Sequence, residues 1–488
     1  MASLSWWSRS RLALHDLVKA ARQFEPELWR NFQRELSPSR HWADRAVVLT
    51  YAVVTGLVVV AFTLLAEAAT HAFASMSRMH PLAPYAALAW TPLLTVAIVW
   101  CTRRFVPGAA GSGIPQVILA LDDRMSRSRI KGLVSLRLAL SKVGLVSAGL
   151  LAGLSIGREG PTVQVGAGVM SHARRWLSPG SSIDAHDLMV AGAAAGIAAA
   201  FNTPLGGIVF ALEQLTRRRH LSHSSLVIAC IVLAGLVAIA VFGNETYFGK
   251  LSVQSVSWEL LGPGVLVVLV AGLAGGLFSR LMILSLRGLP GRLSQWRLAH
   301  PLRFAAACAF GVALIGIVTA GATAGAGYAT TRALLEGQAE IPGIYTLLKF
   351  CASWLSAWTG APAGVFAPSL AIGAGIGHDV SLLTGVTGQA AIPLIALGMV
   401  GFLAATTQGP ITAFIIVMEM VSGQAMVLSL MASALLAGAV SRLISPPLYG
   451  ELAALLMPVP DPPDAQPREP TPASDRGTPP PSSGPGPG

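Results

Sequence analysis

Three short motifs that combine glycine with proline are the strongest candidates for chemistry in this sequence. They stand at residues 111–115 (GSGIP), 157–161 (GREGP) and 364–368 (GVFAP). Proline fits the first turn of a helix and glycine lets the backbone bend, so each motif predicts the start of a helix. The N–H groups of a first turn have no partner within the helix, and the helix dipole adds about half a positive charge there. Several such ends that converge would bind an anion without a full positive charge.

Glu159 lies inside the second motif, in a stretch apolar enough to sit at membrane depth. An ionisable side chain at that depth is a candidate for function. Its carboxylate is itself an anion, so it would compete with a transported anion for the same site, and protonation would release it. We therefore predict that Glu159 is a gate opened by acid and a candidate proton carrier. The alternative is a structural carboxylate that stabilises a helix N-terminus through the dipole.

The composition predicts that a bilayer surrounds most of the chain. Hydrophobic residues make up 53% of the 488 residues and charged residues only 12%, about half the charged share of a soluble domain. Glycine and proline interrupt many of the apolar blocks, and irregular backbone at membrane depth is tolerated only where protein buries it or a cavity borders it. We predict an all-α polytopic membrane protein with broken, tilted helices. The apolar blocks are 46–70, 143–157, 188–212, 226–242, 264–278, 304–320 and 411–440.

The net charge of +11 comes largely from basic residues between the apolar blocks, such as Arg217, Arg218 and Arg219. Short loops rich in Lys and Arg stay in the cytoplasm, so we predict a multi-pass inner (plasma) membrane protein with both termini cytoplasmic. Membrane lipid is the expected partner of this charge, and no aromatic-basic module supports nucleic acid as a partner. The four cysteines form no metal-ligand pattern. With no catalytic triad, phosphate-binding loop or cofactor motif, we predict that the chain is not an enzyme and needs no cofactor or metal.

The chain divides by composition into three parts. Residues 1–44 predict a cytoplasmic amphipathic segment, in which tryptophan and leucine interleave with basic residues. Residues 45–457 form the membrane domain. Residues 458–488 are rich in Pro, Gly and Ser with almost no apolar side chains, which predicts a disordered cytoplasmic tail.

An internal repeat is visible within the membrane domain. Pro204 and Glu213 recur 206 residues later as Pro410 and Glu419, and the GREGP motif has its counterpart in GVFAP 207 residues later. Duplicated halves in a membrane protein usually pack with inverted topology and place the substrate site between them. The predicted parts are repeats at about 45–242 and 262–442, followed by a final helix at 443–457.

The order and spacing of these motifs resemble those of the CLC family of chloride channels and chloride/proton exchangers. The resemblance covers about residues 45–450 and rests on GSGIP, GREGP, GVFAP and the run Pro447-Leu448-Tyr449. It implies the inverted-repeat CLC fold, a homodimer, and one pathway for the chloride ion in each subunit.

The resemblance also implies a role for individual residues. Ser112 and Tyr449 would donate hydroxyl groups to the central anion, and Glu159 would be the gate. Lys142 and Arg158 would raise the electrostatic potential near the pathway. Family members that favour nitrate typically have proline at the position of Ser112, so the serine favours chloride. The other implied anion-binding positions, in the backbone of the corners, are Gly113, Ile114, Gly160, Val365 and Phe366.

The sequence departs from the family's exchangers on the inner side of the pathway. The second glutamate, which relays protons there, corresponds to Gln214, and glutamine cannot carry a proton at neutral pH. Glu213 would substitute, but its repeat partner Glu419 indicates a structural role for both. The sequence therefore favours a passive chloride channel gated by Glu159. The alternatives are a chloride/proton antiporter with a nonstandard proton route and, less favoured, a carrier of a larger solute.

Overall fold

A computed structural model describes most of the membrane domain. The described residues are 39–216, 223–243, 247–248, 258–288, 291–337 and 343–457. The predictions for most of the amphipathic N-terminal segment, for Arg217, Arg218 and Arg219, and for the tail at 458–488 lie outside them. The chain separates into two units, Met1–Leu456 and Met457–Gly488, and the first unit holds every helix given below.

The described residues form helices and connecting turns, without a β-strand, which confirms the predicted all-α fold. The helices of the first half are α3 (Ser39–Arg78), α4 (Ala83–Phe105), α5 (Ile114–Ala120), α6 (Arg127–Leu133), α7 (Leu136–Leu151), α8 (Glu159–His172), α9 (Ala185–Phe201), α10 (Pro204–Phe210) and α11 (Ser224–Phe242). Those of the second half are α12 (Leu261–Arg287), α13 (Arg292–Ala299), α14 (Pro301–Val318), α15 (Tyr328–Leu335), α16 (Tyr345–Trp358), α17 (Phe366–Leu383), α18 (Ala391–Thr407), α19 (Pro410–Met420) and α20 (Val427–Arg442), followed by α21 (Leu448–Leu455).

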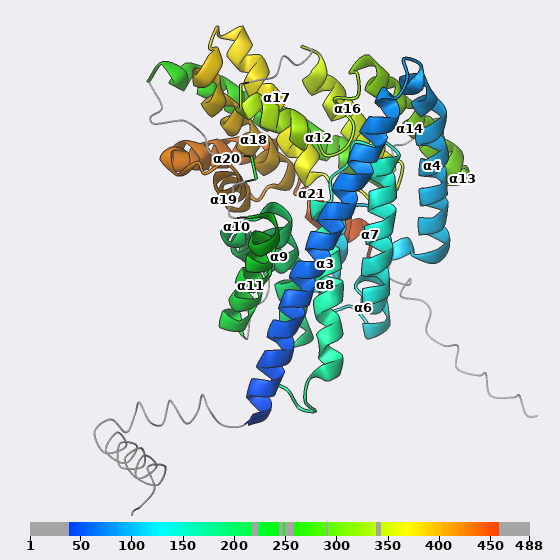
Figure 1. Ribbon diagram of the computed structural model, residues 1–488, viewed down its shortest axis with the longest axis vertical. Coiled ribbons are helices and arrows are strands. Elements are labelled where there is room, and N and C mark those ends of the chain that lie inside the picture. Colours follow the sequence, from blue (N-terminus) through cyan, green and yellow to red (C-terminus); the bar gives the residue numbers. More distant parts are fainter. Residues whose placement is uncertain are drawn as a thin grey trace, which may run out of the picture. The chain divides into compact units, whose positions relative to one another are not determined.

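Nine helices within the described ranges are long and apolar enough to cross a membrane, so the protein is a multi-pass membrane protein. The longest is α3, with 40 residues. At 1.5 Å per residue it measures about 60 Å, roughly twice the hydrocarbon thickness, so it must tilt or extend beyond the bilayer. Figure 1 shows α3 running obliquely along α7 and α8, which it contacts.

The apolar block predicted at 188–212 is broken into two helices, and the second half contains the same break. Helix α9 ends at Phe201, the next residue, Asn202, is in the left-handed conformation with φ of 57°, and α10 begins at Pro204. Helix α18 ends in the same way at Thr407, with Gln408 left-handed at φ of 51°, before α19 begins at Pro410. A left-handed residue ends a helix and proline starts the next one, so this local sequence sets the break.

The last helix is shorter than the 15-residue segment predicted at 443–457. Helix α20 ends at Arg442 and α21 begins only at Leu448. Pro446 and Pro447 lie between them, and proline lacks the N–H that helix continuation requires. The extended connection places Tyr449 in the first turn of α21.

Glycines allow the central helices to pack backbone against backbone. A Cβ atom on Gly192 of α9 would lie 2.3 Å from the carbonyl oxygen of Gly166 in α8. In the second half, a Cβ on Gly398 of α18 would lie 2.2 Å from the carbonyl oxygen of Gly373 in α17. Small residues at helix interfaces permit this close approach in membranes. Equivalent contacts in the two halves are what a duplicated sequence requires.

Replacing Gly192 by alanine is expected to lower the thermal stability of the purified protein, because backbone atoms in α8 cannot move out of the way. Overpacking of this kind costs about 1–3 kcal/mol. The matched control is Gly316→Ala, because Gly316 is also helical but an added Cβ there meets nothing within 4 Å. Thermal denaturation in detergent should show a lower melting temperature for Gly192→Ala alone. Equal melting temperatures for the two variants would contradict this packing.

Candidate anion site

The three glycine-proline corners meet in the structure. The N–H of Gly157 donates to the carbonyl of Gly364 at 2.8 Å, and the N–H of Gly364 donates to the carbonyl of Gly157 at 2.9 Å. The N–H of Gly111 donates to the carbonyl of Ala361 at 3.3 Å, and the N–H of Ala363 donates to that of Gly111 at 3.1 Å. These backbone bonds join segments about 200–250 residues apart.

Helices begin at each of these corners. Helix α5 begins at Ile114, directly after Gly113, which has a φ of 101° that favours glycine. Helix α8 begins at Glu159 and α17 at Phe366, with Val365 before it. Helix α8 contacts both α5 and α17, and α21 contacts α5. Four helix N-termini, with their partial positive charges, are thus gathered in the interior of the membrane domain.

Two hydroxyl groups lie at this meeting point. Ser112 and Tyr449 are buried, and their hydroxyl oxygens have no hydrogen-bond partner within the described part of the chain. The two side chains lie close together without forming a hydrogen bond. The ring of Phe366 stacks on that of Tyr449 at 6.1 Å and 11°. Gly160 permits the close packing, because a Cβ there would lie 2.3 Å from Ser112 Oγ.

Glu159 places its carboxylate beside the same helix ends. The side chain is completely buried, and the backbone N–H groups of Glu159 itself and of Ala367 in α17 lie near it. Oε1 accepts a hydrogen bond from the hydroxyl of Tyr328. Gly157 leaves room for the other oxygen, because a Cβ there would lie 2.3 Å from Oε2. We call this arrangement the seated position of Glu159; the carboxylate occupies a place where an anion is favoured.

Arg158, the residue before Glu159, is hydrogen-bonded to groups other than the Glu159 carboxylate. Its guanidinium donates to Glu67 at 3.1 Å and to the hydroxyl of Tyr247 at 3.0 Å, and it lies 5.5 Å from the ring centre of Tyr328. The distance from Arg158 Nε to Glu159 Oε1 is longer, 3.9 Å. The hydrogen bonds of Arg158 thus go to Glu67 and Tyr247 and not to the Glu159 carboxylate.

Lys142 anchors the GSGIP corner. Its Nζ is completely buried and donates to the carbonyl of Gly111 at 3.0 Å and to Oε1 of Gln164 at 2.6 Å. The amide of Gln164 in turn donates to the carbonyls of Gly108 and Leu133. Lys142 thus binds the corner through its backbone and through Gln164.

Glu213 and Glu419 each cap the N-terminus of a helix in the opposite repeat. The carboxylate of Glu213 accepts from the N–H groups of Ile411 and Thr412 at 3.1 and 2.8 Å, at the start of α19. The carboxylate of Glu419 accepts from those of Leu205 and Gly206 at 3.2 and 2.7 Å, at the start of α10. A carboxylate at a helix N-terminus satisfies orphan donors and favours the dipole. Both glutamates therefore stabilise the fold by capping a helix.

Gln214 lies in a single π turn, Ala211–Leu215, that follows α10. Its side chain is buried and packs against the turn at Gly409, where a Cβ would lie 2.1 Å from Gln214 Nε2. Single π turns often occur at functional sites. Position 214 therefore carries a buried amide in this turn.

Sequence reasoning missed Tyr328 and Lys349. Tyr328 donates to the Glu159 carboxylate, and Lys349 binds the loop before Tyr328 through the carbonyls of Thr323 and Gly325. The available signal was that Lys349 follows Lys142 by 207 residues, the same offset that relates GREGP to GVFAP.

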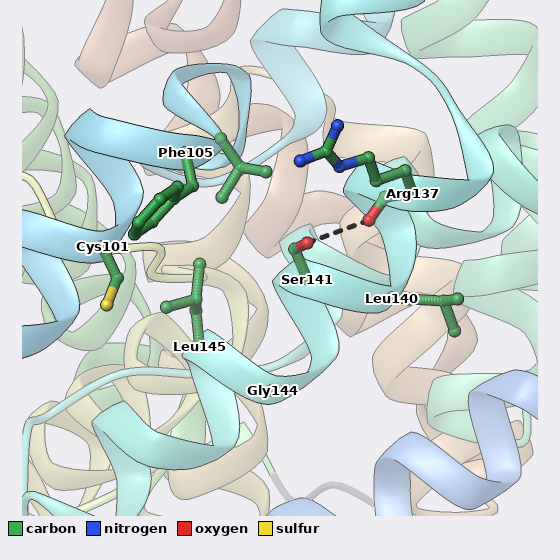
Figure 2. A pocket seen from close by; sticks show the side chains of 8 residues that line it. Cys101, Phe105, Arg137, Leu140, Ser141, Gly144 and Leu145 are labelled. Carbon is green, nitrogen blue, oxygen red and sulfur yellow. Dashed lines mark hydrogen bonds between the residues drawn. The ribbon is translucent and has the colours of Figure 1, made fainter.

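A separate pocket lies between α4 and α7 (Figure 2). Its volume is about 380 Å³, and none of its residues belongs to the three corners. Figure 2 shows Arg137 at one end and the apolar side chains of Phe105 and Leu145 along the wall. We assign it no role in the anion site.

Comparison with known proteins places this arrangement in a family. Residues 93–442 match the family model described as voltage gated chloride channel. A Citrobacter koseri protein described as the H(+)/Cl(-) exchange transporter ClcA is 29% identical over 452 residues, covering 87% of this chain and 90% of its own. The protein of the same description from Vibrio parahaemolyticus is 28% identical over 381 residues, covering 75% and 79%.

Solved structures share the fold. A slow cyanobacterial Cl−/H+ antiporter superposes with a TM-score of 0.70 at 23% identity, covering 86% of this chain and 98% of its own. A eukaryotic CLC transporter gives 0.68 at 21% identity, covering 85% and 74%. Because the family match spans most of the membrane domain and the corners on which the resemblance rested meet in one site, we conclude that the chain belongs to the CLC family.

Proposed function

We propose that this protein exchanges chloride for protons across the membrane through a pathway gated by Glu159. The seated carboxylate of Glu159 carries the proposal, because it occupies the helix ends that would bind an anion. A chloride ion that displaces this carboxylate moves it away from its stabilising donors, which favours its protonation. Movement of the anion and uptake of a proton are then linked at one side chain.

The site suits a small halide. Its donors are backbone N–H groups at helix ends and the hydroxyls of Ser112 and Tyr449, with Lys142 behind the corner rather than in the pathway. Binding without a direct ammonium or guanidinium contact lets an ion leave as easily as it enters, which conduction requires. Chloride, with one charge and no preferred geometry, fits this set of donors.

The second candidate is the passive chloride conductance favoured by the sequence. Gln214 supports it, because the amide cannot pass a proton to the inner side and Glu213 is bound to the start of α19. The relatives described as H(+)/Cl(-) exchange transporters support exchange instead. Exchange would then need a proton route that does not use the side chain at 214.

Reconstitution into liposomes separates the two candidates. A chloride gradient is imposed across vesicles that hold a pH-sensitive dye. A potassium ionophore sets the membrane potential so that it opposes the expected proton movement. We expect chloride moving down its gradient to drive protons uphill in the opposite direction. Chloride flux without uphill proton movement would reject exchange and leave the passive conductance.

We also infer a homodimer with one pathway in each subunit, in contact with membrane lipid and with both termini cytoplasmic. The family resemblance supports the dimer, and the Lys and Arg residues of short loops support the orientation. Cysteine-specific labelling from either side of intact cells, at cysteines added to each terminus, tests the orientation. Mass measurement in detergent tests the dimer.

Replacing Ser112 by proline is expected to shift anion preference from chloride toward nitrate. The change removes a buried hydroxyl beside Tyr449 and leaves the backbone N–H groups of α5 and α17 in place. A lost hydrogen bond to a charged group is worth about 1.5–3 kcal/mol, so the chloride-to-nitrate ratio should fall about tenfold. Flux measured with each anion in proteoliposomes checks this. An unchanged ranking would mean that Ser112 does not border the anion.

A further inference from the structure

A fourth glycine corner lies on the Glu159 side of the site. Residues 325–328 read GAGY, and their backbone repeats that of the GSGI segment at 111–114. Gly325 has a φ of 65° against 68° for Gly111, and Gly327 has 87° against 101° for Gly113. In both segments the second glycine directly precedes a short helix, α15 in one case and α5 in the other.

A buried lysine anchors each of these two corners. Lys142 donates to the carbonyl of Gly111 at 3.0 Å, and Lys349 donates to the carbonyl of Gly325 at 2.8 Å. Both lysines are completely buried. The corner at 325–328 is therefore the second repeat's counterpart of the corner that carries Ser112. Position 326 is alanine, so the hydroxyl in this corner is that of Tyr328.

The ring of Tyr328 is fixed by neighbouring aromatic residues. Its centre lies 4.7 Å from that of Tyr247 and 5.9 Å from that of Phe248. From this position the hydroxyl donates to Oε1 of Glu159. Aromatic packing thus orients the side chain that carries this hydroxyl.

We propose that Tyr328 is the positioning residue of the gate: its hydroxyl holds the Glu159 carboxylate in the seated position and so sets the acidity at which the pathway opens. This inference rests on the proposed function of Glu159. A donor stabilises the charged carboxylate and not the neutral acid, which carries its own proton. While the hydroxyl is present, stronger acid is needed to release the gate.

Among the described side chains, Tyr328 is the one that donates a hydrogen bond to the Glu159 carboxylate. Arg158 Nε is 3.9 Å away and its guanidinium binds Glu67 and Tyr247. Tyr449 faces Ser112 and is not hydrogen-bonded to the carboxylate. The titratable and charged groups around Glu159 are Arg158, Tyr247, Tyr328, Tyr449 and, through Arg158, Glu67.

The test compares Tyr328→Phe with Tyr247→Phe. Both variants keep an aromatic ring in the same cluster, but only the first loses a donor to Glu159, because Tyr247 binds Arg158. Chloride efflux from proteoliposomes is measured across a pH series. We expect the pH of half-maximal flux to rise by about one unit in Tyr328→Phe, since one pH unit corresponds to the lower range of a charge-assisted hydrogen bond. Tyr247→Phe should shift it much less.

Two further measurements guard against a merely structural effect. Replacing tyrosine by 3-fluorotyrosine throughout the chain makes the hydroxyl a stronger donor, so the midpoint should move toward more acidic pH, opposite to Tyr328→Phe. Adding Tyr328→Phe to this labelled protein should remove the acidic shift. In the Glu159→Gln background, Tyr328→Phe should leave the pH profile unchanged.

The outcomes distinguish the role of Tyr328 from the gating role of Glu159. If wild-type flux depends on acid through Glu159 but Tyr328→Phe leaves the midpoint in place, the role of Tyr328 is refuted and the gate stands. An equal shift in the Glu159→Gln background also refutes it. If Glu159→Gln leaves the acid dependence of the wild type intact, the gate fails and the inference on Tyr328 fails with it. If Tyr328→Phe does not fold, the fluorotyrosine shift decides.

Discussion

Replacing Glu159 by glutamine is expected to abolish both the acid dependence of chloride flux and any proton movement coupled to it. Glutamine is nearly isosteric with glutamate but remains neutral at every accessible pH. It cannot compete as an anion for the helix ends at Glu159 and Ala367. Chloride flux at neutral pH should rise about tenfold, which corresponds to about 1.4 kcal/mol that chloride no longer needs to displace the carboxylate. Chloride efflux and dye-reported proton uptake in proteoliposomes measure both effects.

The control for this prediction is Glu67→Gln. Glu67 belongs to the same cluster through its 3.1 Å bond to Arg158, but its side chain is 45% exposed, whereas that of Glu159 is completely buried. It should retain the acid dependence of flux. If the acid response survived in Glu159→Gln and disappeared in Glu67→Gln, the gating carboxylate would be Glu67 and not Glu159.

Replacing Lys142 by methionine is expected to weaken chloride binding and destabilise the protein. The substitution leaves the carbonyl of Gly111 and the side-chain oxygen of Gln164 without their buried donor, at about 1–3 kcal/mol each. It also removes the potential behind the GSGIP corner, so the chloride dissociation constant should rise about tenfold or more. Calorimetric titration of chloride and thermal denaturation measure the two effects.

Lys349→Met is the matched control for Lys142→Met. Lys349 is equally buried and also binds two oxygens, the carbonyls of Thr323 and Gly325. Its loss should reduce stability to a similar degree. Because its corner positions Tyr328 and not Ser112, chloride affinity should change less than in Lys142→Met. Equal losses of affinity in the two variants would indicate a general structural defect in place of a local potential.

The corners could be predicted from the sequence because their determinants are local. Glycine a few residues before a first-turn proline favours a helix start, and the near-equal offsets of GREGP and GVFAP placed two corners in equivalent positions. A structural role for Glu213 and Glu419 was also predicted, since both occupy the same register, but their capping of helices α19 and α10 was not. The CLC fold followed from these motifs and is confirmed.

Tyr328 could not be predicted in the same way. The segments GSGI and GAGY share only their glycines, and Gly111 is separated from Gly325 by 214 residues, unlike the 206 or 207 of the other motifs. Loops of different length had shifted the register. The 207-residue offset of Lys142 and Lys349 is visible in the sequence, but the matching backbone angles and the bonds from each lysine to its corner appear only in the folded chain. The hydroxyl that reaches Glu159 therefore becomes visible only when the two repeats are brought together.

Competition between Glu159 and the anion for one place is tested most directly by anomalous diffraction from crystals grown in bromide. In the wild type at neutral pH, we expect bromide beside the hydroxyls of Ser112 and Tyr449, with the Glu159 carboxylate in its seated position. In Glu159→Gln, a further bromide should occupy the place of that carboxylate, at the N–H of Ala367. Bromide bound only elsewhere in both proteins, or an unchanged set of peaks in the variant, would contradict the account.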